Sequence, residues 1–176
     1  MVQCALLVLV AVAAVGSIHV TAGAAEATPP AVALPAAARE FLEAHNGARA
    51  AVGVEPMKWS EQVASISSKY VRLQRDKMGC QFANLTAGKF GANQLWARGT
   101  LVTPRMVVDH WVKEKPFYNH TDNSCAPNHK CGVYTQVVWR SSLQLGCAQA
   151  TCVQDQASLT ICFYDPPGNY VGEKPY

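Results

Sequence analysis

Six cysteines that follow an apolar leader constrain this chain more than any other feature. Residues 1–24 contain no Lys, Arg, Asp or Glu and end in small residues, which predicts a secretory signal peptide cleaved near Ala24. An uncleaved membrane anchor is the alternative, and it is disfavoured because glycine and polar residues interrupt the apolar run. Of seven cysteines, Cys4 leaves with the signal.

The remaining cysteines predict a disulfide framework. Six cysteines, an even number, in a secreted chain imply three disulfides, and six cysteines can pair in fifteen different ways. Five residues separate Cys125 from Cys131, which suits a local bridge. No Cys-x-x-Cys pair supports zinc, and a chain that pairs every mature cysteine has no thiol left for a nucleophile. The six are Cys80, Cys125, Cys131, Cys147, Cys152 and Cys162.

Length and charge narrow the class of protein. The 176 residues favour one domain, which follows the signal peptide and a flexible Ala/Pro-rich lead-in at residues 25–35. The net charge of +3 lacks the clustered basic footprint of nucleic-acid binding, so we expect no nucleic-acid partner. We interpret the densest basic stretch, residues 69–77, as a solvated helix face.

Three helices are predicted in the first two thirds of the chain. One runs over residues 36–51, and His45 on its apolar stripe is interpreted as a hydrogen-bonded core histidine rather than a ligand. A second begins after Ser60, a plausible N-cap, and ends at Gly79-Cys80. The third begins at Thr103-Pro104 and runs to about residue 115.

Strand signals dominate the last third. Residues 131–139 combine period-two alternation with turn residues at both ends, which predicts a buried strand. Two more strands are predicted at residues 145–152 and 159–164, whereas residues 81–99 indicate a long loop or a short irregular strand. Helices followed by a run of strands predict an α+β fold with an antiparallel sheet.

The motifs of common enzymes are missing. There is no Gly-x-Ser-x-Gly, His-Glu-x-x-His, Walker loop or Gly-x-Gly-x-x-Gly. His110 and Glu114 lie four residues apart on one predicted helix face, as an ion pair or, with help from elsewhere, as part of a metal site.

Several segments together resemble the plant pathogenesis-related proteins of group 1, in the CAP superfamily of cysteine-rich secretory and antigen 5-like proteins. They are residues 44–49, Trp111-Val112-Lys113-Glu114-Lys115, residues 131–139 and Asp165-Pro166-Pro167-Gly168-Asn169-Tyr170. The resemblance covers residues 36–176. It implies a three-layer α-β-α sandwich with a central antiparallel sheet and the bridges Cys80–Cys152, Cys125–Cys131 and Cys147–Cys162.

The family's cavity usually holds two histidines and two glutamates that bind a divalent metal. At the matching positions this chain has Asn84, Ala92 and Val133, and only Glu114 is kept. One carboxylate does not make a useful zinc site, so we expect neither a metal nor another cofactor.

Two sequons are present, Asn84-Leu85-Thr86 and Asn119-His120-Thr121, and polar flanks make Asn119 the safer glycosylation prediction.

The resemblance implies a secreted, monomeric, non-enzymatic defence protein of the apoplast. It would bind sterol or lipid and act on the membranes of fungi or oomycetes. The candidate aromatic side chains for such a groove, for which a place in the core is the equal alternative, are Phe82, Phe90, Trp96, Phe117 and Tyr118. The alternative is a precursor cleaved between Asp165 and Pro166 to release Pro166 to Tyr176 as a signalling peptide. A proline-fixed C-terminal tail that packs on the domain is favoured over this cleavage, and a metal-dependent hydrolase is the third hypothesis.

Overall fold

The computed structural model describes residues 33–85, 88–98 and 102–176. The signal peptide prediction and most of the lead-in therefore lie outside the described residues. Four α-helices, a 3₁₀ turn and six strands follow one another along the described chain. They are α1 (Ala36–Ala50), β1 (Lys58–Trp59), α2 (Glu61–Lys77), β2 (Gly91–Arg98), α3 (Pro104–Val112), η1 (Lys115–Phe117), β3 (Tyr118–Asn119), β4 (Ser124–Cys125), α4 (Gly132–Val137), β5 (Gln144–Cys152) and β6 (Ala157–Asp165).

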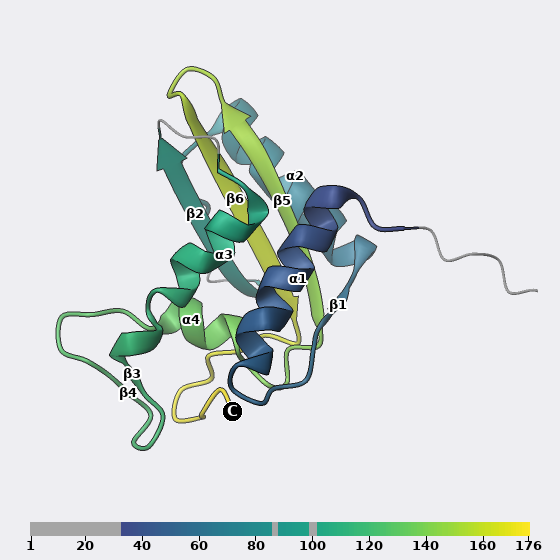
Figure 1. Cartoon of the computed structure of the whole chain (residues 1–176). Coiled ribbons are helices and arrows are strands. Elements are labelled where there is room, and N and C mark those ends of the chain that lie inside the picture. Colours follow the sequence, from purple (N-terminus) through teal and green to yellow (C-terminus); the bar gives the residue numbers. More distant parts are fainter. Residues whose placement is uncertain (1–32, 86–87, 99–101) are drawn as a thin grey trace, which may run out of the picture. The chain divides into compact units, whose positions relative to one another are not determined.

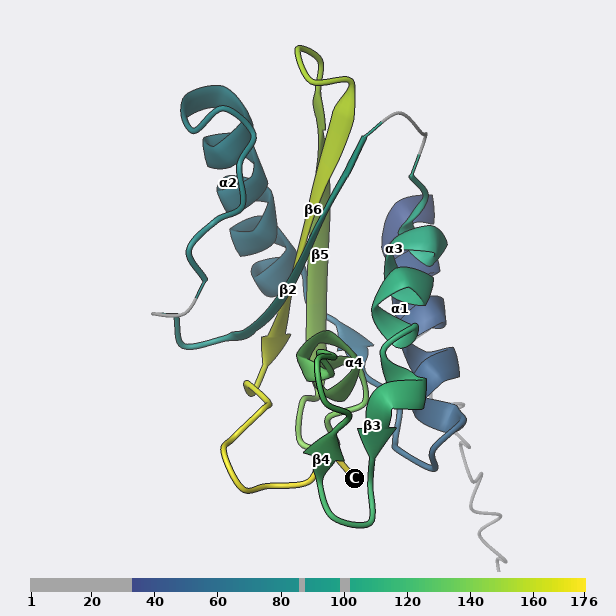
Figure 2. The same ribbon diagram turned by 90° about the vertical axis from the view of Figure 1, so that its left-hand side faces the viewer.

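A four-stranded sheet forms the middle layer, with strand order β1-β5-β6-β2. Strands β5, β6 and β2 are antiparallel, and the two-residue β1 pairs with β5 in parallel. Helix α2 covers one face of the sheet, while α1 and α3 cover the other (Figures 1 and 2). The predicted α-β-α sandwich is thereby confirmed. The short β3–β4 hairpin stands apart as a second sheet.

Each face of the sheet carries its own apolar core. On the α1 and α3 face, Phe41, Val108, Trp111 and Leu145 are buried in one cluster. On the α2 face a second cluster contains residues of α2, β5 and β6. Helix α2 approaches β5 closely because position 146 is glycine: a Cβ there would overlap the backbone of α2. Apolar burial of this kind is the main stabilising term of the fold.

The predicted helix starts are correct. The Ser60 hydroxyl accepts a hydrogen bond from the Val63 amide at 3.4 Å, and the Thr103 hydroxyl accepts one from Met106 at 3.3 Å. Each bond satisfies one of the amides that a helix start leaves without a partner. Helix α3 ends at Val112, three residues before the predicted end, and Pro116 lies in the 3₁₀ turn that follows.

The strand predicted at residues 131–139 is wrong, because Gly132–Val137 form helix α4. Residues 134–139 are all buried, so the alternation of residue types does not correspond to one solvent-exposed and one buried face of a strand. Residues 81–99 also hold more regular structure than expected. Strand β2 pairs with β6 over its whole length, from Gly91 opposite Tyr164 to Arg98 opposite Ala157.

Three disulfides tie these elements together. Cys80–Cys152 joins the segment after α2 to the end of β5, Cys125–Cys131 joins the β3–β4 hairpin to the start of α4, and Cys147–Cys162 crosses from β5 to β6. These are the pairs that the resemblance implies. Cross-links that close loops of this kind stabilise a fold largely by restricting the unfolded chain.

Candidate functional site

Glu114 and Val133 meet at the start of α4. The Glu114 Oε2 atom accepts hydrogen bonds from the amides of Val133 and Tyr134, at 3.0 and 3.2 Å. The Val133 side chain packs against the apolar cluster on the α1 and α3 face. A carboxylate is well placed here, because unpaired amides and the helix dipole make a helix start positive. Glu114 therefore serves as a cap for α4.

The other two positions of the family's cavity lie elsewhere. Ala92 packs against the cluster on the α2 face of the sheet, whereas Val133 packs against the cluster on the opposite face. Asn84 is exposed and lines a cavity of about 220 Å³ beside α2. The structure thus does not gather the four positions around one point.

The donor set does not fit a metal ion. His110 is exposed, and no group of three or more His, Cys, Asp or Glu residues that could hold a metal occurs within the described part of the chain. Zinc sites need three or four such ligands together, and Glu114 is already engaged by two amides. The His110–Glu114 ion pair is also absent from the ion pairs within 4.0 Å among the described residues.

A buried network of polar side chains runs from α1 to the backbone of Val133. His45 is fully buried, and its Nδ1–H donates to the Phe41 carbonyl at 2.7 Å. Its Nε2 therefore accepts from the Tyr164 hydroxyl at 2.9 Å, and that hydroxyl accepts from the Asn93 amide at 3.1 Å. Asn93 also donates to the Val133 carbonyl at 2.9 Å. The interpretation of His45 as a hydrogen-bonded core residue is confirmed.

Burial sets the protonation state of His45 and Tyr164 in this hydrogen-bonded network. Removal from water lowers the pKa of His45 from 6.5 to about 4, because the charged imidazolium is disfavoured in the apolar interior. Burial likewise raises the pKa of the Tyr164 hydroxyl far above its ordinary value. Both groups are neutral at pH 7, so they act as hydrogen-bonding groups of the core rather than as an acid and a base.

The sequence pattern did not single out Arg49, a second buried polar side chain beside this network. It is fully buried in α1, and burial lowers its pKa to about 10, so it stays charged at pH 7. Its guanidinium donates only to backbone carbonyls. The acceptors are Glu55 at 2.8 Å, Val137 at 3.2 Å, Trp139 at 2.7 Å, Arg140 at 3.4 Å and Ser142 at 3.1 Å. The signal that could have found it is the Arg at helical spacing from the buried His45 stripe.

The aromatic side chains predicted to line a lipid groove fall in separate places. Phe82 and Trp96 line one cavity of about 370 Å³. Phe90 lines the cavity of about 220 Å³, and Tyr118 lines a third, of about 310 Å³, between α4 and the C-terminal segment. Phe117 instead stacks on the ring of His129, with 3.6 Å between the two ring centroids. Of these five aromatic side chains, Phe82 and Trp96 line the same cavity in the described part of the chain.

The C-terminal segment 166–176 is packed along α4. The Pro166 carbonyl accepts from Ser142, and Asn169 bonds both Gly132 and Thr135. Further on, the Pro175 carbonyl accepts from the Arg140 amide at 2.7 Å. The segment therefore has bonds along its length in the uncleaved protein.

The sequons differ in their surroundings. Asn119 is exposed, its Oδ1 accepts from the Thr121 amide at 3.0 Å, and its Nδ2 donates to Asp122 at 3.2 Å. Thr86, which completes the Asn84 sequon, lies outside the described residues. Use of either sequon stays a prediction.

Across the described residues, none of the helices has the length and apolar character needed to cross a bilayer.

Known proteins are similar to this chain in sequence and in fold. The STS14 protein of Solanum tuberosum is 63% identical over 80% of this chain, which spans 65% of that protein's length. Pathogenesis-related protein 1C of Nicotiana tabacum is 43% identical over 78% of this chain and 80% of its own.

Solved structures agree on the fold. Venom allergen-like protein 4 of Schistosoma mansoni matches with a TM-score of 0.64 at 23% identity, over 81% of this chain and 95% of that one. MpPR-1i matches with a TM-score of 0.53 at 20% identity, over 76% and 89%. The model of the cysteine-rich secretory protein family, CAP, matches residues 42–164. This chain therefore belongs to the CAP family and is of the pathogenesis-related protein 1 type.

Proposed function

We propose that this chain is a secreted plant defence protein that binds a sterol-class lipid and catalyses no reaction. Relatives that are named pathogenesis-related proteins support the defence role. Three disulfides support an extracellular location, because such bridges persist in oxidising compartments. The proposal extends to action on fungal or oomycete membranes through sterol withdrawal by a monomer in the apoplast.

The cavity between Phe82 and Trp96 is the observation that carries the lipid-binding proposal. Its volume of about 370 Å³ falls in the usual range of small-molecule sites, roughly 300–1,000 Å³. Phe82 is 58% exposed, so its aromatic face is accessible to a ligand from solvent. Flat aromatic faces suit a fused-ring ligand, and Asp155 in the lining offers an acceptor for a sterol hydroxyl.

A sterol-binding assay with purified protein tests this proposal. Radiolabelled or fluorescent sterol should bind saturably, and Phe82→Ala and Trp96→Ala should each weaken binding by roughly tenfold, as expected for aromatic anchors. Phe117→Ala is the matched control, since this exposed aromatic lies outside the cavity. Sterol binding that is absent, or that survives both cavity variants, would refute the proposal.

The absence of a reaction rests on the donor set. A metal-dependent hydrolase needs ligands that converge on one ion, and Ala92 and Val133 offer no donor side chain. Chelator-sensitive turnover of peptides or esters by the purified protein would contradict a non-enzymatic role.

Release of the peptide Pro166–Tyr176 is the second candidate function. One observation favours it: Pro166 is exposed, so a protease can reach the junction after Asp165. The bonds from Ser142 and Asn169 would hold the cut segment until the domain loosens. Mass spectrometry of apoplastic fluid should detect the free eleven-residue peptide if this function operates; its absence after a defence stimulus would count against it.

A further inference from the structure

Positive charge is concentrated in one part of the chain. Residues 62–98 carry six of the fifteen Lys and Arg residues but only one of the twelve Asp and Glu residues. Because the whole chain has a net charge of +3, the rest of the chain is net negative. The six basic residues are all exposed. They are Lys69, Arg72, Arg75, Lys77, Lys89 and Arg98.

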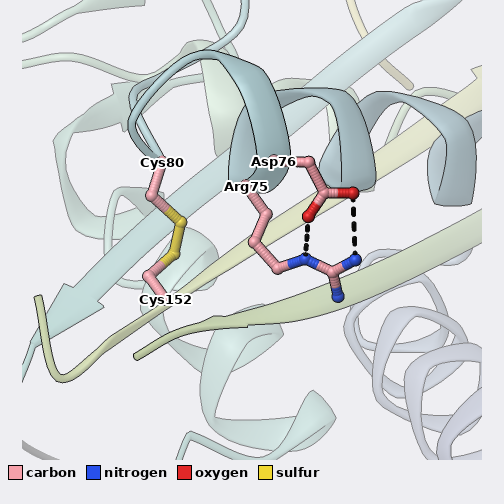
Figure 3. A network of polar contacts seen from close by, with 4 residues as sticks. All are labelled: Arg75, Asp76, Cys80 and Cys152. Carbon is pink, nitrogen blue, oxygen red and sulfur yellow. Dashed lines mark hydrogen bonds and ion pairs between the residues drawn. A yellow bond between two sulfur atoms is a disulfide. The ribbon is translucent and has the colours of Figure 1, made fainter. Parts of the chain in front are cut away.

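The single acid in this segment is neutralised locally. Arg75 binds Asp76 through two hydrogen bonds, Nε to Oδ1 at 2.7 Å and Nη2 to Oδ2 at 3.2 Å (Figure 3). The hydrogen bond from Arg75 lowers the pKa of Asp76, and the charges of Lys77 and Arg72 lower it further. Among the described residues, neither Arg72 nor Lys77 has a carboxylate within 4.0 Å.

Large apolar side chains are exposed beside these cations. Met78 is 53% exposed, Phe82 58% and Val153 81%. They belong to the segment that follows α2 and to the β5–β6 turn, which the Cys80–Cys152 bridge holds together (Figure 3).

Two adjoining cavities place four of these residues, Arg75, Lys77, Phe82 and Val153, on one surface. Arg75, Lys77 and Val153 line a cavity of about 330 Å³, and Phe82 lines the neighbouring sterol-type cavity. Both cavities share Gly79, Cys80 and Asp155. The second acid at this end, Asp155, lies 3.9 Å from the Arg98 guanidinium. We call this the α2-end surface. Arg75, Lys77, Phe82 and Val153 line its cavities; the exposed Arg72, three residues before Arg75 on α2, and the exposed Met78, directly after Lys77, border it.

We infer that the α2-end surface docks on an anionic phospholipid membrane, with its apolar side chains at the acyl boundary and its cations at the headgroups. Exposed apolar side chains interleaved with Lys and Arg are what such an interface binds. A nucleic acid would use the cations but would leave Met78 and Val153 without a partner. The inference goes beyond sterol binding, since it requires no ligand in the Phe82–Trp96 cavity.

Vesicle co-sedimentation of the full mature protein tests this inference. The probes are sterol-free phosphatidylcholine vesicles with and without phosphatidylglycerol, at low and high salt. The protein should bind only the anionic vesicles and should lose binding at high salt, because salt screens the attraction. Arg72→Gln/Lys77→Gln should weaken partitioning by roughly 25-fold, about fivefold for each charge near the surface.

The matched control is Lys113→Gln/Lys115→Gln. It removes the same net charge near the end of α3, on the other face of the sheet (Figure 2). This control should partition nearly like the parent protein. Met78→Ser/Val153→Ser separates insertion from charge attraction: it should weaken binding while the salt dependence stays, and circular dichroism should show an intact fold in every variant.

Two outcomes overturn the inference. One is equal binding to vesicles with and without phosphatidylglycerol, and the other is an equal loss in the two charge variants, which would reflect net charge rather than this surface. Because the vesicles lack sterol, a failure here leaves the sterol assay untouched. A failure of sterol binding likewise leaves the vesicle result intact.

Discussion

Replacement of Arg49 by methionine tests what holds α4 in place. The guanidinium donates to five carbonyl groups, and those of Val137, Trp139 and Ser142 lie at or just beyond the end of α4. Carbonyls at a helix end are the groups that the helix itself cannot satisfy, and the helix dipole makes that end negative. Methionine is similar in length but offers no donor, so Arg49→Met leaves buried acceptors unpaired.

The expected loss follows from two opposing terms. A hydrogen bond to a charged group contributes about 1.5–3 kcal/mol, so five bonds contribute on the order of 10 kcal/mol. Dehydration of the buried guanidinium costs several kcal/mol, which methionine avoids. The net expectation is that Arg49→Met lowers the free energy of unfolding by about 3–5 kcal/mol. Arg49→Lys keeps the charge but has fewer hydrogen-bond donors, so it should lose about half as much free energy of unfolding.

Guanidinium denaturation at neutral pH, with the disulfides oxidised, measures these differences. Hydrogen exchange then locates the change, because amides of α4 should exchange faster in Arg49→Met than those of α2. A loss below about 1 kcal/mol would refute the reasoning, since it would mean that water or a rearranged backbone satisfies the five carbonyls equally well.

Three further predictions concern the same region. Because the pKa of His45 is lowered from 6.5 to about 4, the unfolded chain binds this proton first as the pH falls, so stability should drop by about 3 kcal/mol between pH 6.5 and pH 4. Denaturation at a series of pH values should show this drop, and a variant His45→Gln that kept it would disprove the assignment. Calorimetric titration with zinc should show no saturable micromolar binding, either for the parent protein or for Glu114→Gln. The Glu114→Gln variant should lose about 1 kcal/mol of stability, because the first turn of α4 loses its charged acceptor. Micromolar zinc binding by the parent protein would contradict the role of Glu114. Asn169→Ala removes bonds to Gly132 and Thr135, so limited proteolysis should cut the C-terminal segment faster than in the parent; an unchanged rate would argue that these bonds do not hold it.

Much of the fold could be predicted from sequence because its signals are local. Ser60 and Thr103-Pro104 mark helix starts through bonds that span only three residues. The strands β5 and β6 lie within one residue or two of their predicted bounds, since residues on either side of a short polar turn pair directly. Spacing suggested the local Cys125–Cys131 bridge, whereas the other two pairings came from the resemblance, because the number of cysteines does not identify their partners.

The segment 131–139 could not be predicted because its partners are distant. Val133, Thr135 and Val137 are β-branched, which favours a strand by local propensity. The contacts that decide the outcome come from Arg49, nearly ninety residues away, and from Glu114, nineteen residues away. Tertiary contacts of this kind override propensities that differ by less than about 1 kcal/mol per residue.

Glu114 and Arg49 together give a structural reason for a carboxylate at position 114, where the resemblance implies a metal ligand. Helix α4 has only six residues, too few to be stable alone, so both of its ends need partners. The carboxylate binds the amides of its first turn and the guanidinium binds the carbonyls beyond its last. Glu114 is therefore required by the helix whether or not a metal is present, whereas Ala92 and Val133 need only fill space in two apolar clusters. The positive end of this short helix therefore accounts for the carboxylate of Glu114 without a metal ion.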